Sequence, residues 1–263
     1  MREGCVTLHT SASEIEKKEL MKSENSYIKN FYDTFSKHLN IAGYNLRHYQ
    51  IAKWIDKLCE LDSSSSAMEI GCGPGHSTIN LTSRIKEGQI VAVDISVENI
   101  EIAKKLHQKV ENIDFVVSDM SDFKSDLKFD LILLPDVLEH IPIDQHNNLF
   151  NTLRRYLKDS GKVVIHIPDP EYLEFKHKTA KETLQVIDQP IHTDIISKNL
   201  RDTGLRMTFL QSYNLSSMDY DYQVIKLEPN DLELKDKPKH WDRSLKSRVR
   251  RRIDSLLGRK SFE

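Results

Sequence analysis

Cysteine, glycine and long apolar runs are all scarce in this sequence. Its 263 residues include three cysteines and nine glycines. The cysteines follow no metal-ligand or disulfide spacing, which excludes a disulfide-rich scaffold and indicates a reducing compartment. No run of about 18 apolar residues occurs, which excludes a transmembrane helix, and the N-terminus lacks the apolar core of a signal peptide. We therefore expect a soluble, cytoplasmic protein.

A strong excess of charge of either sign is also missing. The chain carries 38 Lys and Arg against 40 Asp and Glu, a net charge of −2. Charge therefore does not favour a nucleic-acid partner. The length suffices for one α/β domain with a sizeable core. We expect a small-molecule partner, and the sequence is compatible with both a monomer and a homodimer.

Three of the nine glycines lie together in residues 68–75, which read Met-Glu-Ile-Gly-Cys-Gly-Pro-Gly. An apolar run that breaks into alternating glycines predicts a buried strand, a tight turn and then a helix. Glycine can adopt positive φ and lets a ligand approach the backbone, while the helix N-terminus faces that ligand. The segment predicts a binding site for a nucleoside-like molecule.

The glycine spacing narrows the choice of ligand. A dinucleotide site requires G-x-G-x-x-G and a P-loop requires Gly-Lys-Ser/Thr, and neither pattern is present. Glu69 lies two residues before Gly71 and would repel a pyrophosphate. It would suit a cationic ligand such as an amine or a sulfonium.

Acidic residues end the next two predicted strands, 89–94 and 113–119, at Asp94 and Asp119. A carboxylate at the end of a parallel strand can accept the hydroxyls of a ribose. Each acid could instead cap the helix or turn that follows it. With further strands at 129–135 and 161–167, the order of motifs resembles that of class I S-adenosylmethionine-dependent methyltransferases. The resemblance implies that Asp94 binds the ribose and that Asp119 or Met120 faces the adenine, with Gly71, Gly73, Ile95 and Pro135 in the same pocket.

The resemblance also implies the fold class: α/β, with a Rossmann-like, doubly wound, mostly parallel sheet of seven strands in the order 3-2-1-4-5-7-6. The last strand is expected to be antiparallel, and N-terminal helices are expected to form a lid. We expect a mobile segment at 1–23 and a methyltransferase domain at 24–234. Within that domain, 24–60 would form the lid and 168–190 a substrate cap with a helix over 171–186. Other helices are predicted at 45–58, 76–86, 97–109, 144–157 and 192–203.

Two N-terminal residues are further candidates for the cofactor pocket. Tyr27 belongs to a set of aromatic residues at helical spacing, which would either pack on the core or cover the cofactor. The chain Asn45-Leu-Arg47 is similar to the Asn-x-x-Arg of the ubiquinone-biosynthesis O-methyltransferase family, but one residue shorter. That resemblance implies that Arg47 contacts the carboxylate of the cofactor.

The loop after the fourth strand is where we expect the chemistry. Asp136, Glu139 and His140 lie at helical spacing there, and the segment resembles the Glu-Val-Leu-Glu-His-Val of the same O-methyltransferases. The three side chains could bind Mg²⁺, although the same motif is widespread in enzymes that use no metal. We predict His140 as the general base, with Glu139 beside it and His166, at the end of the fifth strand, as the second candidate.

The segment 235–263 has eleven Lys or Arg and four acids, with apolar residues at helical spacing. It predicts a basic amphipathic helix that either covers the domain or contacts a membrane surface, a polyanion or another subunit. For the whole chain we predict methyl transfer from S-adenosylmethionine to a hydroxyl of a small polar biosynthetic intermediate, such as a sugar or nucleotide-sugar, giving S-adenosylhomocysteine. The alternatives are an N-methyltransferase, an RNA methyltransferase and a non-catalytic module that binds S-adenosylmethionine.

Overall fold

The computed structural model describes residues 43–216 and 220–230. The predicted mobile segment at 1–23, most of the predicted lid with Tyr27, and the predicted C-terminal helix at 235–263 lie outside the described residues. The first described helix is α2 (Leu46–Leu58). It begins at Asn45, whose side chain accepts a hydrogen bond from the backbone N–H of Arg47 while its own N–H donates to the His48 ring. This capping box fixes the start of α2.

Seven strands form one sheet in the order β3-β2-β1-β4-β5-β7-β6, which confirms the predicted order. Strand β7 runs antiparallel to both of its neighbours, β5 and β6, and the other neighbouring strands are parallel. The strands are β1 (Ala67–Ile70), β2 (Ile90–Asp94), β3 (Ile113–Val117), β4 (Phe129–Pro135), β5 (Leu157–Pro168), β6 (Leu205–Tyr213) and β7 (Tyr222–Pro229).

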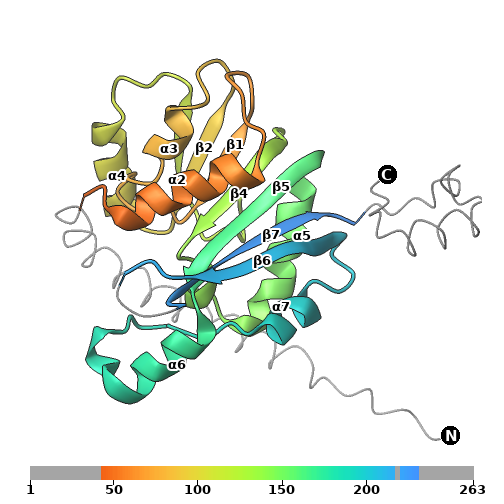
Figure 1. Ribbon diagram of the computed structural model, residues 1–263. Helices are drawn as coiled ribbons and strands as arrows, with labels where there is room; N and C mark the ends of the chain where they lie inside the picture. Colours follow the sequence, from red (N-terminus) through yellow and green to blue (C-terminus); the bar gives the residue numbers. More distant parts are fainter. Residues whose placement is uncertain (1–42, 217–219, 231–263) are drawn as a thin grey trace, which may run out of the picture. The chain divides into compact units, whose positions relative to one another are not determined.

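Helices cover both faces of the sheet (Figure 1). On one face α2 packs with Leu81 and Ile85 over Ile90 and Leu131. On the opposite face α5 (His146–Tyr156) and α7 (Thr193–Asn199) pack over a second apolar cluster, which includes Val91. Successive residues of a strand point to opposite faces, so Ile90 and Val91 serve different clusters. Because the parallel strands run in one direction, their carboxyl ends lie along one edge of the sheet, between the two layers of helices.

Several predicted boundaries are wrong, among them the ends of the helices predicted at 97–109 and 192–203, which are α4 (Val97–Leu106) and α7 (Thr193–Asn199). Helix α3 covers only Ile79–Thr82, because the N–H groups of residues 86–88 donate to the Ser63 carbonyl instead of extending the helix. Helix α6 covers Pro170–Thr179 and is followed by a 3₁₀ turn, so the cap helix is shorter than 171–186. Strand β5 begins at Leu157, four residues before Gly161, because Leu157 still pairs with Phe129. Helix α4 (Val97–Leu106) starts where it was predicted.

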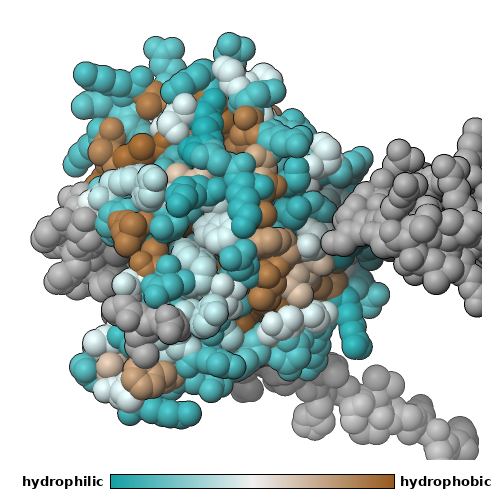
Figure 2. All heavy atoms as spheres, viewed as in Figure 1, coloured by the Kyte–Doolittle hydropathy of each residue, from teal (hydrophilic) through white to brown (hydrophobic). Residues whose placement is uncertain are grey.

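The surface shown in Figure 2 is mostly hydrophilic, with apolar side chains in separate small patches. Single exposed apolar residues are normal on folded proteins and identify no interface by themselves. Within the described ranges, none of the helices is both long and apolar enough to cross a membrane.

Candidate active site

A cavity of about 700 Å³ lies at the carboxyl ends of the parallel strands. This volume is in the range of pockets that hold small molecules and cofactors. The sheet brings together residues that are far apart in the sequence, as expected for an open α/β sheet. Of the predicted site residues, those that line the cavity are Arg47, Gly71, Gly73, Asp94, Ile95, Asp119, Met120, Pro135, Asp136 and His140.

The glycine turn forms part of the cavity wall. Gly71 and Gly73 have φ values of +75° and +53°, in the region that favours glycine. A Cβ on Gly71 would collide with Val137, whereas a Cβ on Gly73 would meet no atom within 4 Å. The backbone at Gly73 therefore faces open space, which a ligand can fill.

Asp94 holds this turn in place. One carboxylate oxygen accepts a hydrogen bond from the N–H of Gly73 at 2.8 Å, and the other accepts from the N–H of Ser96 at 2.9 Å. Ser96 in turn caps α4. The cap of α4 is therefore Ser96 and not Asp94. Asp94 stabilises the turn, and its binding of a ribose stays a prediction.

Glu69 does not line the cavity, so its predicted role as a direct partner of a cationic ligand is wrong. Its side chain is fully buried behind the turn, where its carboxylate accepts hydrogen bonds from the hydroxyls of Ser77 and Thr78. Burial raises the pKa of Glu69 to about 7, against the effect of the two hydroxyls. Glu69 connects β1 to the segment after the turn, and at neutral pH it is only partly ionised.

Two residues at strand ends have positive φ although they are not glycine: Met120 at +70° and Asp136 at +54°. A bulky residue in this region is uncommon, and such strain gathers at functional sites. Both residues line the cavity. Asp119, beside Met120, is exposed and accepts a hydrogen bond from the N–H of Ser121 at 2.9 Å.

Arg47 and Asp136 form an ion pair across the cavity wall, with 3.1 Å between Nη1 and Oδ2. Burial would raise the pKa of Asp136, but Arg47 and His166 outweigh it and lower the pKa to about 2. The carboxylate in turn raises the pKa of Arg47. Asp136 is therefore an anion, and Arg47 is placed at the cavity by the start of α2.

His166 is not part of the cavity wall, and its predicted role as a second base is wrong in position. The side chain is 1% exposed, its Nε2 lies 2.7 Å from the hydroxyl of Tyr213, and its ring stacks on Tyr222. Because side chains alternate along β5, His166 lies on the same face of the sheet as Val164, the face that α2 covers. His166 belongs to the buried support of Asp136, from which its Nδ1 lies 3.7 Å away.

His140 lies in a short 3₁₀ turn after β4 (Leu138–His140) and lines the cavity. Its Nδ1 lies 3.0 Å from Oδ1 of Asp188 and also contacts the Ile187 carbonyl. Its Nε2 lies 3.8 Å from Oε1 of Glu139. Burial alone would lower the pKa of His140, but Glu139 and Asp188 outweigh it and raise the pKa to about 9. Glu139 itself is buried and does not line the cavity, and burial raises its pKa.

The structure does not assemble Asp136, Glu139 and His140 into a metal site. Asp136 turns toward Arg47, and Glu139 lies behind the cavity wall. In the described part of the chain, no three His, Cys, Asp or Glu side chains are grouped so that they could hold a metal ion. The predicted Mg²⁺ ligand set is therefore wrong, because the turn after β4 splits its members between two directions.

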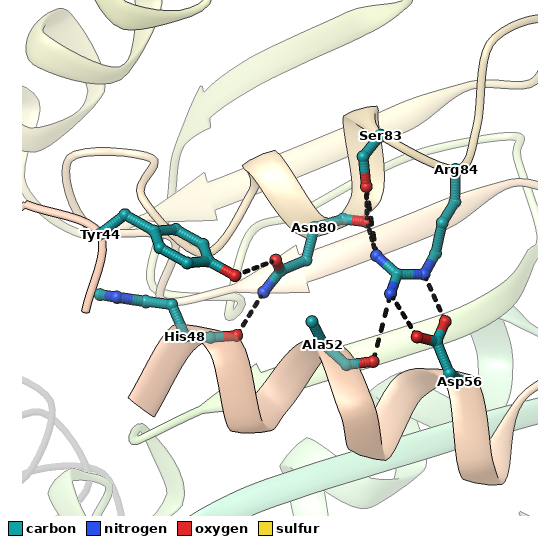
Figure 3. Close-up of polar contacts among 7 residues, drawn as sticks. All are labelled: Tyr44, His48, Ala52, Asp56, Asn80, Ser83 and Arg84. Carbon is teal, nitrogen blue, oxygen red and sulfur yellow. Dashed lines mark hydrogen bonds and ion pairs between the residues drawn. The ribbon is translucent and has the colours of Figure 1, made fainter. Parts of the chain in front are cut away.

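Helix α2 is fastened to α3 by a network of polar contacts (Figure 3). The Asn80 side chain accepts a hydrogen bond from the Tyr44 hydroxyl at 2.9 Å and donates one to the His48 carbonyl at 2.8 Å. Arg84 binds both carboxylate oxygens of Asp56 at 2.7 and 2.8 Å. The network joins the helix that carries Arg47 to the helix that follows the glycine turn.

Sequence reasoning missed several residues of the site. One face of the segment that leads into and through α5 lines the cavity, with Gln145, Asn148, Leu149 and Thr152. Their i, i+3, i+4 and i+7 spacing was a signal for a shared face, but polar residues on a helix usually face solvent. Gln185 and Asp188 were also missed, because only tertiary structure brings the 184–191 segment against the turn after β4.

The comparisons with known proteins agree with this geometry. A family model for the methyltransferase domain matches residues 61–220, more than half of the chain. The chain therefore belongs to this methyltransferase-domain family, and its sheet has the strand order of the class I S-adenosylmethionine-dependent methyltransferase fold.

Individual relatives are more distant. The chain is 30% identical over 123 residues to a trans-aconitate 2-methyltransferase of Azoarcus sp. strain BH72, covering 47% of this chain and 46% of the relative. The chain thus spans about half the length of the curated relatives it matches.

Two solved structures share the fold. Magnesium protoporphyrin IX methyltransferase from Synechocystis PCC 6803, with bound S-adenosylhomocysteine, has a TM-score of 0.61 at 17% identity, covering 77% and 98% of the two chains. The N-methyltransferase NodS from Bradyrhizobium japonicum WM9 has a TM-score of 0.54 at 18% identity, covering 70% and 94%.

Proposed function

We propose that this protein transfers a methyl group from S-adenosylmethionine to a hydroxyl oxygen of a small polar molecule. One observation carries the choice of acceptor: His140 lines the cavity and is held at Nδ1 by the Asp188 carboxylate. An imidazole held in this way can take a proton through Nε2, as a hydroxyl acceptor requires.

The cavity wall fits the methyl donor. We propose that the backbone at Gly71 and Gly73, the carboxylates of Asp94 and Asp119, and the backbone around Ile95, Met120 and Pro135 hold its adenosine part. Arg47 would bind its carboxylate, sharing its charge with Asp136. When bound, the donor supplies an electrophilic methyl group on a sulfonium, so the protein mainly needs to position the acceptor.

The proton has a defined destination in this proposal. As the acceptor oxygen forms its bond to the methyl carbon, the carbon–sulfur bond breaks and its electron pair returns to sulfur, giving S-adenosylhomocysteine. The hydroxyl proton moves to Nε2 of neutral His140. Because the pKa of His140 is about 9, most molecules are protonated at pH 7, and the rate should rise with pH up to about that value.

A carboxylate acceptor is the second candidate, and the raised pKa of His140 is the observation that favours it. A carboxylate has no proton to lose, and a protonated His140 could bind and orient it. The 30%-identical relative is named for trans-aconitate, which is a polycarboxylate. The two candidates predict opposite pH dependence: above the pKa of His140 the rate reaches its maximum for a hydroxyl acceptor and falls for a carboxylate.

The test is methyl transfer from radiolabelled S-adenosylmethionine into separate pools of hydroxylated small molecules, polycarboxylates, amines and RNA. We expect label in the hydroxylated pool and a His140→Gln variant slower by about 10²–10⁴. His192→Gln is the matched control, because His192 pairs with Glu174 and does not line the cavity. Label in amines or RNA would overturn the proposal, and cofactor binding with no labelled pool would indicate a non-catalytic binding module.

A further inference from the structure

We propose that Asp188 is the positioning residue for His140, and that the segment from residue 184 to 191 is a strap that orients the base toward the bound acceptor. This inference rests on the proposed function, in which His140 receives the acceptor proton. It assigns a role to a residue outside the glycine turn, outside the loop after β4 and outside the cavity wall.

The contact geometry supports a specific pair. Oδ1 of Asp188 lies 3.0 Å from Nδ1 of His140, and the two side chains are only 10% and 11% exposed. The Ile187 carbonyl contacts the same nitrogen. With Nδ1 held by two acceptors from the strap, the ring donates there in both protonation states, and proton exchange with an acceptor in the cavity goes through Nε2.

The strap is stabilised by a contact within itself before Asp188 and by contacts to the turn after it. Before it, the other carboxylate oxygen of Asp188 accepts a hydrogen bond from the Gln185 N–H at 2.7 Å. After it, Gln189 donates from its backbone N–H to the Glu139 carbonyl at 3.0 Å and from its side chain to the Ile141 carbonyl at 2.9 Å. The strap is therefore hydrogen-bonded to Glu139 and Ile141, the residues before and after His140, and these bonds fix the position of the ring.

Helix α6 also contacts the strap. The ring of His177, in α6, lies 2.6 Å from the backbone carbonyl of Asp188. Gln185, at the start of the strap, lines the cavity. An acceptor that contacts Gln185 would thus touch the same segment that orients the base.

Three carboxylates interact electrostatically with His140. Glu139 belongs to its own turn, Asp188 to the strap, and Asp136 to the end of β4. Asp188 alone both bonds to the ring and comes from a separate segment. A purely structural Asp188 would shape the strap through Gln185 without affecting how His140 titrates, so titration separates the two roles.

The experiment compares Asp188→Asn with wild type in ¹H–¹⁵N spectra of the histidine rings, recorded across pH on the protein without ligand. The His140 signal is identified by its loss in His140→Gln. We expect Asp188→Asn to lower the midpoint of His140 by at least about one pH unit. Glu174→Gln is the matched control: it removes the carboxylate partner of another histidine, His192 at the start of α7, and should leave His140 unchanged.

Turnover provides the second measurement. In Asp188→Asn we expect the kcat reached at high pH, where His140 is neutral in both proteins, to fall by about tenfold or more with little change in KM, and the pH–rate profile to shift by the same amount as the His140 titration. Asp188→Glu keeps the charge and should keep the wild-type midpoint, and Asp188→Ala replaces Asp188→Asn if that variant does not fold. An unshifted titration, or neutral His140 protonated at Nε2, would overturn the inference. A shifted titration in a protein without turnover would leave the pair intact and overturn the proposed function instead.

Discussion

Arg47 at the start of α2 lies 3.1 Å from Asp136 at the end of β4, and both side chains border the same cavity. The pair ties a helix from before the sheet to its central strand. Removing Arg47 would leave a carboxylate that is 12% exposed with His166, 3.7 Å away, beside it. The contact should therefore matter for stability as well as for binding.

Arg47→Met should lower the free energy of unfolding at pH 7 by about 3 kcal/mol or less, the low end for breaking a buried pair, because Arg47 is itself partly exposed. Since the pKa of folded Asp136 is about 2 and its ordinary value is 3.8, its contribution is present above pH 4 and is lost as pH falls toward 2. The variant should lose less stability over that interval. Urea unfolding at pH 7 and pH 3 measures both effects.

Lys158→Met is the control for this prediction. Lys158 forms a pair of similar length with Asp130, at 2.7 Å, but both partners are more exposed. A surface pair contributes about 0–1 kcal/mol. Equal losses in the two variants would show that the Arg47–Asp136 pair behaves like a surface contact.

Glu69→Gln should change how stability depends on pH. The pKa of Glu69 is about 7 in the folded protein and 4.5 when unperturbed. The folded state therefore holds a proton that the unfolded state releases, and stability falls as pH rises from about 4.5 to 7. Glutamine removes this fall, which amounts to about 3 kcal/mol at most.

Unfolding of wild type and Glu69→Gln at pH 5 and pH 8 tests this prediction. The wild type should lose more stability than the variant between the two values. Glu60→Gln, at an exposed position, serves as the control and should follow the wild type. If the free energy of unfolding changed with pH equally in wild type and Glu69→Gln, the prediction that buried Glu69 holds a proton in the folded state would be wrong.

Much of the fold could be predicted because its signals are local. The glycine turn, the apolar strands and the acids at their ends follow directly from side-chain type and spacing, and the resemblance supplied the strand order. The orientation of side chains was harder. Glu69 and His166 were placed in the site from sequence position alone, but β1 and β5 are covered on both faces, so alternation along the strand decided against them.

The contact of His140 with Asp188 could not be predicted. Its partner Asp188 is 48 residues further along the chain, in a segment without regular secondary structure. Nothing in the local sequence distinguishes Asp188 from other acids of the predicted cap. Only the folded position of the strap selects it.

Gly73→Ala should weaken binding of S-adenosylmethionine by at least about tenfold. The added Cβ meets no protein atom within 4 Å and would occupy space facing the cavity. Its positive φ of +53° adds a strain of about 1–2 kcal/mol. Gly204→Ala is the matched control, with a φ of +70° and no place in the cavity wall. Calorimetry on both variants separates strain from ligand contact: similar losses of affinity would mean that Gly73 has no ligand beside it.

Asn80→Ala should weaken the attachment of α2 to α3. The Asn80 side chain is 3% exposed and bonds to both Tyr44 and the His48 carbonyl, so its removal leaves a buried carbonyl without this donor and should cost about 1–3 kcal/mol. Because α2 carries Arg47 and α3 follows the glycine turn, we also expect a several-fold loss of S-adenosylmethionine affinity. Tyr44→Phe removes only the more exposed of the two bonds and should change affinity little. Unfolding measures the stability of both variants, and calorimetry measures their affinity for S-adenosylmethionine. Reduced stability with wild-type affinity in Asn80→Ala would show that the contacts of Asn80 between α2 and α3 have a structural role only.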